Sequence, residues 1–267
     1  MAEPAWKPGA LLRASAGVHV LALGAVVFKP GLWPWALGAL VLNHGVIAFA
    51  GLWPRSRWLG PNWTRLPAAA AARREIALTI DDGPDPLVTP LVLDLLDRHA
   101  ARATFFCVGE KAARHPALCR EMVRRGHAVE NHSQHHRNHF SVTGPRSMLR
   151  ELQTAQDTLA RVSGERPLFF RAPAGLRNPF LDPVLVKLGL QLASWSVRGF
   201  DTRTGDTARV MRRLEPGLRA GAIVLLHDGN AARTPQGIPV ILEVLPALLE
   251  SISAAGLRTV TLRQALA

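Results

Sequence analysis

Apolar residues follow two different patterns along the chain. Two long apolar stretches open the sequence, Leu11 to Phe28 and Gly31 to Trp53, and the second contains no formally charged residue. A bilayer is spanned by about 20 apolar residues, so the second stretch is long enough to cross one. After residue 74 the apolar runs become shorter and alternate between strand-like and helix-like spacing. The pattern predicts an N-terminal membrane segment followed by an α/β domain.

Residues 1–66 are predicted to anchor the chain in a membrane through one or two transmembrane helices. Lys29-Pro30-Gly31, between the two stretches, is typical of a tight turn and would make them a hairpin. Most of the tryptophans lie near the ends of these stretches, as in an interfacial aromatic belt. A signal sequence or a pair of buried soluble helices would also fit such apolar stretches.

The charges around the apolar stretches indicate an orientation. The first 74 residues hold eight Lys/Arg and one acidic residue, whereas the rest of the chain holds 24 basic and 19 acidic residues, within a net charge of +12. This asymmetry suits a membrane surface better than a nucleic-acid groove, so no nucleic-acid partner is expected. In a hairpin, the two ends would carry four positive charges, on Lys7, Arg55, Arg57 and Arg65, whereas the turn would carry one, on Lys29. The positive-inside rule then predicts an inner-membrane protein whose C-terminal domain faces the cytoplasm.

An Ala-rich linker at residues 67–73 is predicted to lead into a single α/β domain, residues 74–267. The strand candidates of this domain are Glu75–Ile80, Ala103–Val108, Ala128–His132, Leu168–Arg171, Leu190–Val197, Ala222–His227 and Leu257–Leu262. Helical patterns lie between them, and such β–α repeats imply parallel strands with right-handed crossovers. Seven strands of this kind form either an open doubly wound sheet or a distorted (β/α)7 barrel.

Polar groups gather where the predicted strands end, and this favours the barrel. The groups are Asp81-Asp82-Gly83, His132-Ser133, Arg171-Ala172-Pro173, Asp201 and His227-Asp228-Gly229. In parallel α/β barrels the active site is built at the C-terminal ends of the strands, where these side chains would converge. An open sheet would spread them along a crevice near one switch point.

Asp82, His132 and His136 form a candidate metal site. The two histidines are four residues apart, so one helical turn would place them on the same face. Two neutral imidazoles and one carboxylate, with further positions open to water, suit a catalytic divalent metal. Taken alone, the histidine pair also fits a polar surface loop, and Asp-Asp-Gly-Pro also describes an ordinary turn.

Five motifs, in order, resemble the polysaccharide deacetylase family, the NodB-homology group of carbohydrate esterase family 4. In this sequence they are Thr79-Ile80-Asp81-Asp82-Gly83-Pro84, His132-Ser133-x-x-His136, Arg171-x-Pro173, Asp201 beyond Trp195, and Leu225-Leu226-His227. The resemblance covers Arg74 to Ala267. It implies a metal-dependent hydrolase that removes an N-acyl group, expected to be acetyl, from an amino sugar in a polysaccharide or glycan precursor. Zinc (Zn2+) is the expected ion, with cobalt, nickel and manganese as alternatives.

The resemblance also implies a role for each residue near the metal. Asp82, His132 and His136 would bind the ion, and Asp81 would act as the general base. Arg171 would pair with Asp81 and hold it ionised, as an adjacent cation should.

On the leaving-group side, the resemblance implies that His227 acts as the general acid and that Asp201 orients it. Leu225 would line the pocket for the acyl methyl group, and a backbone N–H near Pro173 and Ala174 would help to stabilise the oxyanion. From the residues alone, Asp201 also fits a helix cap, and His227 a satisfied core histidine.

The chain departs from the family pattern on the substrate side. Ala174 stands where the family usually has an aromatic residue, and Thr202 follows Asp201 where many relatives have tryptophan. With a membrane anchor, these changes favour a lipid-linked glycan precursor, since some family members act on amino sugars carried on a polyprenyl phosphate. Basic residues near the membrane, such as Arg55 and Arg57, would help to hold its phosphate. A degenerate glycan-binding scaffold at the membrane is the non-enzymatic alternative, and the retained base, ligands, arginine and acid argue against it.

Overall fold

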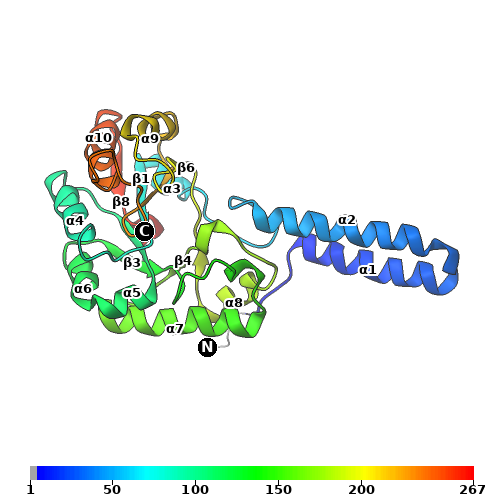
Figure 1. Cartoon of the computed structure of the whole chain (residues 1–267). Helices are drawn as coiled ribbons and strands as arrows, with labels where there is room; N and C mark the ends of the chain where they lie inside the picture. Colours follow the sequence, from blue (N-terminus) through cyan, green and yellow to red (C-terminus); the bar gives the residue numbers. More distant parts are fainter. Residues whose placement is uncertain (1–4) are drawn as a thin grey trace.

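The computed structural model describes residues 5–267, so the first four residues of the predicted anchor lie outside it (Figure 1). Its eight strands form one sheet whose paired neighbours all run parallel. The strands are β1 (Glu75–Asp81), β2 (Thr104–Cys107), β3 (Ala128–Asn131), β4 (Phe169–Phe170), β5 (Gln191–Leu192), β6 (Val197–Arg198), β7 (Ile223–His227) and β8 (Arg258–Val260).

The sheet curves into a distorted, incomplete barrel, which confirms the predicted fold class. Its strand order is β5-β4-β3-β2-β1-β7-β6, and β8 pairs with β1 beside this path. All seven residues of β1, at the centre, are buried. A strand covered on both faces needs apolar side chains on both, which explains the continuous apolar run that β1 shows in the sequence.

Helices surround the sheet on its outer side (Figure 1). They are α4 (Thr89–Arg98), α5 (Gly109–Arg114), α6 (Pro116–Arg124), α7 (Pro145–Ser163), α8 (Leu181–Leu188), α9 (Thr207–Leu214) and α10 (Ile241–Ala254). Short 3-10 turns are η2 (Phe140–Val142), η3 (Pro173–Gly175), η4 (Glu215–Gly217) and η5 (Gln264–Leu266). The longest of the barrel helices, α7, begins with Pro145 and ends at left-handed Gly164, residues that suit these two helix ends.

The single strand predicted at Leu190–Val197 is two short strands, β5 and β6, so that prediction is wrong in detail. Between them the chain turns its carbonyl groups towards the buried guanidinium of Arg171. Arg171 Nε donates to the Ala193 carbonyl at 3.1 Å, and Nη2 donates to the Ser194 carbonyl at 2.8 Å. Because these carbonyls serve Arg171, they cannot continue a strand ladder at the same positions.

The segment that precedes the barrel helps to close it. Trp63 N–H donates to the Leu192 carbonyl at 2.9 Å, and Ser194 N–H donates to the Trp63 carbonyl at 2.8 Å. Three residues later, Leu66 N–H donates to the Gly221 carbonyl at 2.9 Å. The segment therefore lies between β5 and the start of β7, across the open edge of the sheet.

The division into residues 1–66, 67–73 and 74–267 remains a prediction, but the structure adds detail at its boundary. Most of the range expected to be a linker is the short helix α3 (Ala68–Ala72). Leu66 and Ala70 are buried in the same apolar cluster as the inner side chains of the barrel. The chain around this boundary thus packs as part of the barrel, because its apolar residues fill the open edge.

The N-terminal stretches form two antiparallel helices that project from the barrel, α1 (Ala10–Phe28) and α2 (Trp33–Leu52), joined by η1 (Pro30–Leu32) (Figure 1). Both are long and apolar enough to cross a membrane, and in each only 11% of the most apolar window is buried. Large apolar side chains point outwards; Leu21 is 74% exposed and Phe28 is 90% exposed.

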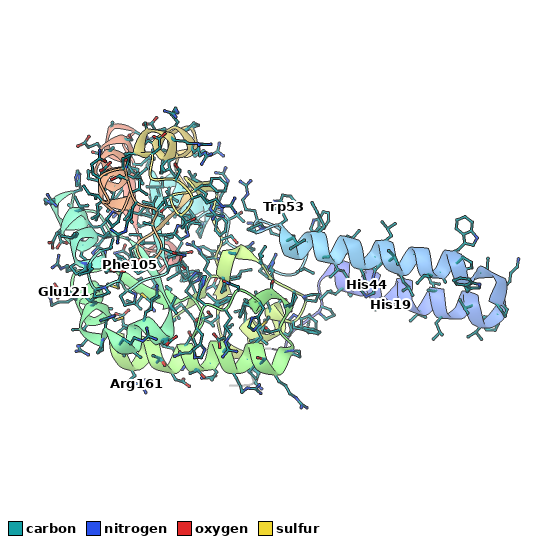
Figure 2. All side chains as sticks on the ribbon, viewed as in Figure 1. His19, His44, Trp53, Phe105, Glu121 and Arg161 are labelled. Carbon is teal, nitrogen blue, oxygen red and sulfur yellow. The ribbon has the colours of Figure 1, made fainter. Side chains whose placement is uncertain are left out.

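Polar side chains lie between these two helices. Asn43 Nδ2 donates to Ser15 Oγ at 2.9 Å, and the rings of His19 and His44 are 5.2 Å apart between centroids (Figure 2). Gly51, at the end of α2, accepts from Arg177 N–H at 3.1 Å and joins the hairpin to the barrel.

Candidate active site

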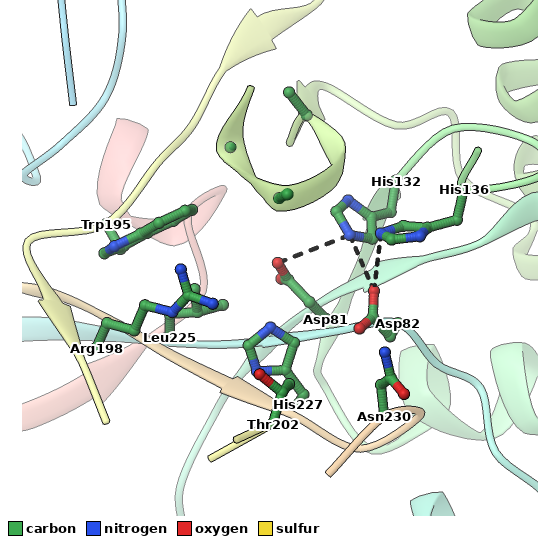
Figure 3. Close-up of a pocket in the computed structure, with 13 residues that line it drawn as sticks. Asp81, Asp82, His132, His136, Trp195, Arg198, Thr202, Leu225, His227 and Asn230 are labelled. Carbon is green, nitrogen blue, oxygen red and sulfur yellow. Dashed lines mark ion pairs between the residues drawn. The ribbon is translucent and has the colours of Figure 1, made fainter. Parts of the chain in front are cut away.

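Five strand ends deliver polar side chains to one face of the barrel (Figure 3). Asp81 ends β1 and lies directly opposite His227, which ends β7. The remaining groups follow β3, β4 and β6 in the chain, at His132, Arg171 and Asp201. Asp81, His132 and His227 line a cavity of about 140 Å³, whereas Arg171 and Asp201 bond to Asp81 and His227 and do not line it. This is the strand-end position at which barrel enzymes place their chemistry.

Asp82, His132 and His136 offer three ligand atoms within 4.8 Å of one another. Asp82 Oδ1 lies 3.2 Å from His132 Nε2 and 3.2 Å from His136 Nε2. Two ligand atoms that share an ion at about 2.1 Å lie about 3 to 3.4 Å apart, so these separations fit a common divalent metal.

The loop that carries the two histidines is not a helix, so the predicted helical turn is wrong. His132 to His136 has irregular backbone, and both Ser133 (φ 67°) and His136 (φ 50°) are left-handed. Ser133 N–H donates to Asn131 Oδ1 at 2.8 Å, and His136 N–H donates to Ser133 Oγ at 3.0 Å. These local bonds bend the loop back on itself and bring the two imidazoles together.

Two further observations fit a cation site at this cluster. Asp82 Oδ1 is buried without a hydrogen-bond donor in the described chain, although it faces two imidazole nitrogens. Burial alone would raise the pKa of Asp82, but the neighbouring His132 outweighs burial and lowers that pKa. The donor set fits zinc or a similar ion, since it consists of two imidazoles and one ionised carboxylate.

His132 is oriented for such a role. Its Nδ1 lies 2.8 Å from the Arg171 carbonyl, which makes Nδ1 the protonated nitrogen and directs the Nε2 lone pair at Asp82 and His136. Burial, followed by the charge of His132, lowers the pKa of His136. A neutral imidazole is the form that binds metals.

Arg171 is almost fully buried beside Asp81. Its Nη1 donates to Asp81 Oδ1 at 2.7 Å and to Thr79 Oγ1 at 2.8 Å, and the guanidinium stacks on Phe106 at 4.1 Å. Burial lowers the pKa of Arg171, against the opposing charge of Asp81. Since Oδ1 is occupied by Arg171, Asp81 Oδ2 is the oxygen that faces the metal cluster, 3.8 Å from His132 Nε2.

His227 and Asp201 form a second buried pair on the other side of the cavity. Asp201 Oδ2 accepts from the His227 backbone N–H at 2.7 Å, and Oδ1 lies 3.0 Å from His227 Nδ1. Burial alone would lower the pKa of His227, but the charge and hydrogen bond of Asp201 outweigh it and raise that pKa. Asp201 does not cap the next helix; that position belongs to Asp206, whose carboxylate accepts from Arg209 N–H at 2.9 Å.

The three residues predicted to contact the substrate do not all reach the cavity. Leu225 and Ala174 line the cavity, whereas Pro173 is buried behind its wall. Ala174 has a left-handed backbone (φ 54°), which gives the wall at this point its sharp turn.

Six further lining residues were not among the predicted site residues: Ala172, Gly175, Trp195, Arg198, Thr202 and Asn230. Trp195 contributes an aromatic side chain to a wall from which the family's usual aromatic is missing at Ala174. It is also the one tryptophan that lies outside the first 63 residues, a sequence signal that could have singled it out. Arg198 offered no comparable signal, because an arginine after a short strand is usually a surface residue.

Comparisons with known proteins agree with this geometry. The Polysaccharide deacetylase family matches residues 68–193. A chitooligosaccharide deacetylase of Bradyrhizobium sp. (strain ANU 289) is 38% identical over 157 residues, covering 58% of this chain and 71% of that protein. A peptidoglycan-N-acetylglucosamine deacetylase of Bacillus cereus is 33% identical over 193 residues, covering 72% of this chain and 87% of that protein.

Solved structures share the fold as well. A family 4 acetyl xylan esterase from Clostridium thermocellum, in complex with a cobalt ion, aligns with a TM-score of 0.63 at 29% identity. The alignment covers 72% of this chain and 89% of that one. The chain therefore belongs to the polysaccharide deacetylase family, carbohydrate esterase family 4.

Proposed function

We propose that this protein removes the acetyl group from the nitrogen of an amino sugar in a glycan, with a divalent metal held by Asp82, His132 and His136. One observation carries the proposal. A three-ligand cluster borders the same cavity as Asp81, which is paired with Arg171, and His227, which is paired with Asp201. Hydrolysis of an unactivated amide needs an electrophile for the carbonyl, a base for the water and an acid for the leaving amine.

The metal-binding residues supply the first of these requirements. An ion held there would polarise the acyl carbonyl and lower the pKa of the attacking water. With an ion bound, His132 and His136 would present neutral nitrogens and Asp82 an ionised oxygen, and the cavity leaves room beside them for substrate and water. Zinc is the ion we expect, with cobalt, nickel and manganese as alternatives that the same donors accept.

Asp81 is placed to act as the base. Its Oδ1 is held by Arg171, which leaves Oδ2 to accept the proton of the attacking water. The bonds from Arg171 to Thr79 and to two main-chain carbonyls fix the guanidinium, so Asp81 cannot swing away from the cavity.

His227 is placed to act as the acid. Asp201 binds Nδ1, so Nε2 is the nitrogen free to protonate the leaving amine. The raised pKa of His227 favours the protonated ring, as an amide requires because an amide anion is a poor leaving group.

The walls of the cavity suit the rest of an N-acetyl sugar. Leu225 offers an apolar surface for the acyl methyl group, and the Ala174 N–H is the donor we assign to the developing oxyanion. The sugar ring would rest on Trp195, which replaces the aromatic side chain missing at Ala174.

We further propose that the hairpin of α1 and α2 anchors the enzyme in a membrane and that its substrate lies at the membrane surface. A Cβ on Gly175, in the cavity wall, would lie 2.7 Å from Pro54 at the base of the hairpin, so the cavity and the hairpin are neighbours. A polyprenyl-phosphate-linked amino sugar is a second candidate substrate on this ground. The positive flanks of the hairpin make the cytoplasmic side our prediction for the barrel.

The test uses the full-length protein in detergent, with and without His132→Ala/His136→Ala. We expect about one divalent metal per chain by elemental analysis, and loss of that metal in the double variant. Acetate release from N-acetylglucosamine oligomers should fall by at least about 10³-fold in the variant, since the ion acts directly on the reacting carbonyl.

His135→Ala is the matched control, because His135 bonds to Glu151 at 2.9 Å and faces away from the cluster. It should retain both metal and activity. A folded wild-type protein that takes up no zinc or cobalt, or a double variant that deacetylates normally, would exclude the proposed mechanism.

A further inference from the structure

A second cavity, of about 350 Å³, adjoins the catalytic one. The two share Trp195 and Arg198 as a common wall. On its other side the second cavity is lined by Trp53 and Pro54, which follow directly on the last residue of α2. It therefore lies between the reaction centre and the base of the apolar hairpin.

Arginines dominate this second cavity. Arg55, Arg198 and Arg213 line it, and Arg203 lies close to the same group. Arg55 and Arg213 reach main-chain carbonyls only, at 3.5 Å to Ser196 and 3.3 Å to Gly199. None of the four pairs with a carboxylate in the described chain, whose arginine ion pairs involve other residues: Arg73, Arg114, Arg124, Arg125, Arg166, Arg171, Arg258 and Arg263.

Phe200 gathers three of these arginines around one aromatic ring. The guanidinium carbons of Arg198, Arg213 and Arg203 lie 4.7, 5.1 and 5.9 Å from its centroid. Phe200 has a left-handed backbone, φ 61°, which is strained for a bulky side chain. A ring held in this way fixes like charges close together, and their mutual repulsion is relieved when an anion binds between them.

Arg198 carries the clearest sign of a missing partner. Its Nε is buried without an acceptor in residues 5–267. Burial lowers the pKa of Arg198, and the charge of Arg203 acts in the same direction. The charge of the buried Asp201 acts to raise the pKa of Arg198, but the carboxylate is bonded to His227 and forms no ion pair with Arg198 in residues 5–267.

We propose that Arg55, Arg198, Arg203 and Arg213 form an anion subsite that binds a phosphate group of the substrate, beside the cavity that holds its N-acetyl sugar. The inference rests on the proposed deacetylase function, and adds that the enzyme prefers a phosphate-bearing amino sugar. Four guanidinium groups match a phosphate better than a carboxylate, because each presents a planar pair of donors to the phosphate oxygens.

The position of the subsite suggests where such a phosphate comes from. Trp53 and Pro54 directly follow the last residue of α2. In a membrane, this end of the helix would lie at the interface with water. A glycosyl phosphate attached to a membrane lipid would have its phosphate at this depth and its sugar in the catalytic cavity. A soluble sugar phosphate carries the same group, so the experiment must separate the two sources.

The test compares N-acetylglucosamine 1-phosphate with N-acetylglucosamine on the full-length protein in detergent. Calorimetry measures binding, and acetate release gives kcat/KM. We expect the phosphate to improve both by at least about 100-fold, and Arg213→Gln and Arg203→Gln each to reduce that preference by about 10-fold, as for a lost charge-assisted hydrogen bond. Arg198→Gln should reduce it at least as much.

Arg212→Gln is the matched control, since Arg212 is an exposed neighbour on α9 and lines neither cavity. It should keep the full preference. Equal binding of both sugars by the wild-type protein, or a preference that survives Arg213→Gln, Arg203→Gln and Arg198→Gln, would overturn the subsite.

Two further results separate the proposals and the sources. If the protein binds the sugar phosphate through these arginines but releases no acetate from either sugar, the subsite stands and the proposed deacetylation fails. An alkyl ester of the phosphate that binds about 10-fold tighter than the free sugar phosphate supports a lipid-linked substrate. Equal binding of the two supports a soluble sugar phosphate.

Discussion

The helical hairpin and the barrel place their apolar and polar side chains in opposite ways. In the barrel, large apolar residues are buried around β1, and buried charged groups form pairs such as Arg171–Asp81 and His227–Asp201. In the hairpin, Leu21 and Phe28 are exposed, whereas the bond between Ser15 and Asn43 lies between the helices. More than half of the exposed large apolar residues of the described chain belong to α1 and α2.

The difference is the one that the proposed membrane anchor would produce, because burial has different consequences in water and in lipid. A barrel in water gains stability by burying apolar surface, at roughly 25 cal/mol per Å². A hairpin in lipid gains nothing from hiding apolar surface, and instead pairs its polar groups inside. The segment from Pro54 to Leu66 joins the two, and it belongs with the barrel because Leu59 and Leu66 are buried.

The largest expected effect tests that assignment of the joining segment. A fragment beginning at Ala68 should be less stable than one beginning at Pro54 by about 5 kcal/mol or more. It loses the burial of Leu59 and Leu66, at about 1.5–3 kcal/mol each, and the backbone bonds of Trp63 and Leu66, at about 1 kcal/mol each. Urea unfolding monitored by circular dichroism measures the difference, and equal midpoints would show that the segment is only a tether.

A loss of similar size is expected in the reaction itself. His227→Gln should lower kcat by roughly 10²–10⁴-fold, the usual contribution of a general acid. Asp201→Asn should act in the same direction by weakening the hold on Nδ1. In the wild type, kcat should fall as pH rises through the raised pKa of His227, and His227→Gln should lose this dependence. An unchanged pH–rate profile in the variant would assign the acid to another group.

The same substitution at two equally exposed leucines tests the contrast between the regions directly. Leu21 is 74% exposed in the hairpin, and Leu87 is 76% exposed on the barrel. Leu21→Arg should cost about 2.5–3.5 kcal/mol of membrane insertion and release protein from the membrane fraction, whereas Leu87→Arg should not. If both variants partition like the wild type, the hairpin does not face lipid.

The smallest effect concerns a buried histidine of the barrel. Burial lowers the pKa of His127 to about 4, and its Nδ1 accepts from Ala103 N–H at 3.2 Å. In the unfolded chain it titrates near 6.5, so between these values the unfolded state binds more protons and folding weakens as pH falls. From pH 7.5 to pH 5 the free energy of unfolding should drop by about 2 kcal/mol through this group.

His127→Gln should make that pH dependence shallower, measured by urea unfolding at each pH. His99→Gln is the matched control, since His99 is exposed and should leave the slope unchanged. An identical slope in the His127 variant would mean that this ring is charged in the folded protein.

Much of the barrel was predictable because its signals are local. The longer strands each appear in the sequence as an apolar run that ends at a polar motif. Parallel strands bring these polar motifs to one face of the barrel, however far apart they lie along the chain. The split into β5 and β6 was not predictable, because the carbonyls of Ala193 and Ser194 turn towards an arginine more than 20 residues earlier. The loop from His132 to His136 was misassigned for a related reason, since i, i+4 spacing is shared by helices and by some tight loops.

The sequence by itself determined which residues are chemically able to act: an acidic pair, two histidines four apart, an arginine and a histidine at strand ends. It also determined the two apolar stretches, because hydropathy over some 20 residues depends on composition alone. Only the tertiary structure decided that Trp63 and Leu66 close the edge of the barrel and that Trp195 and Arg198 join two cavities. Those contacts depend on which distant segments meet, and side-chain pairing across a curved sheet leaves no periodic trace in the chain.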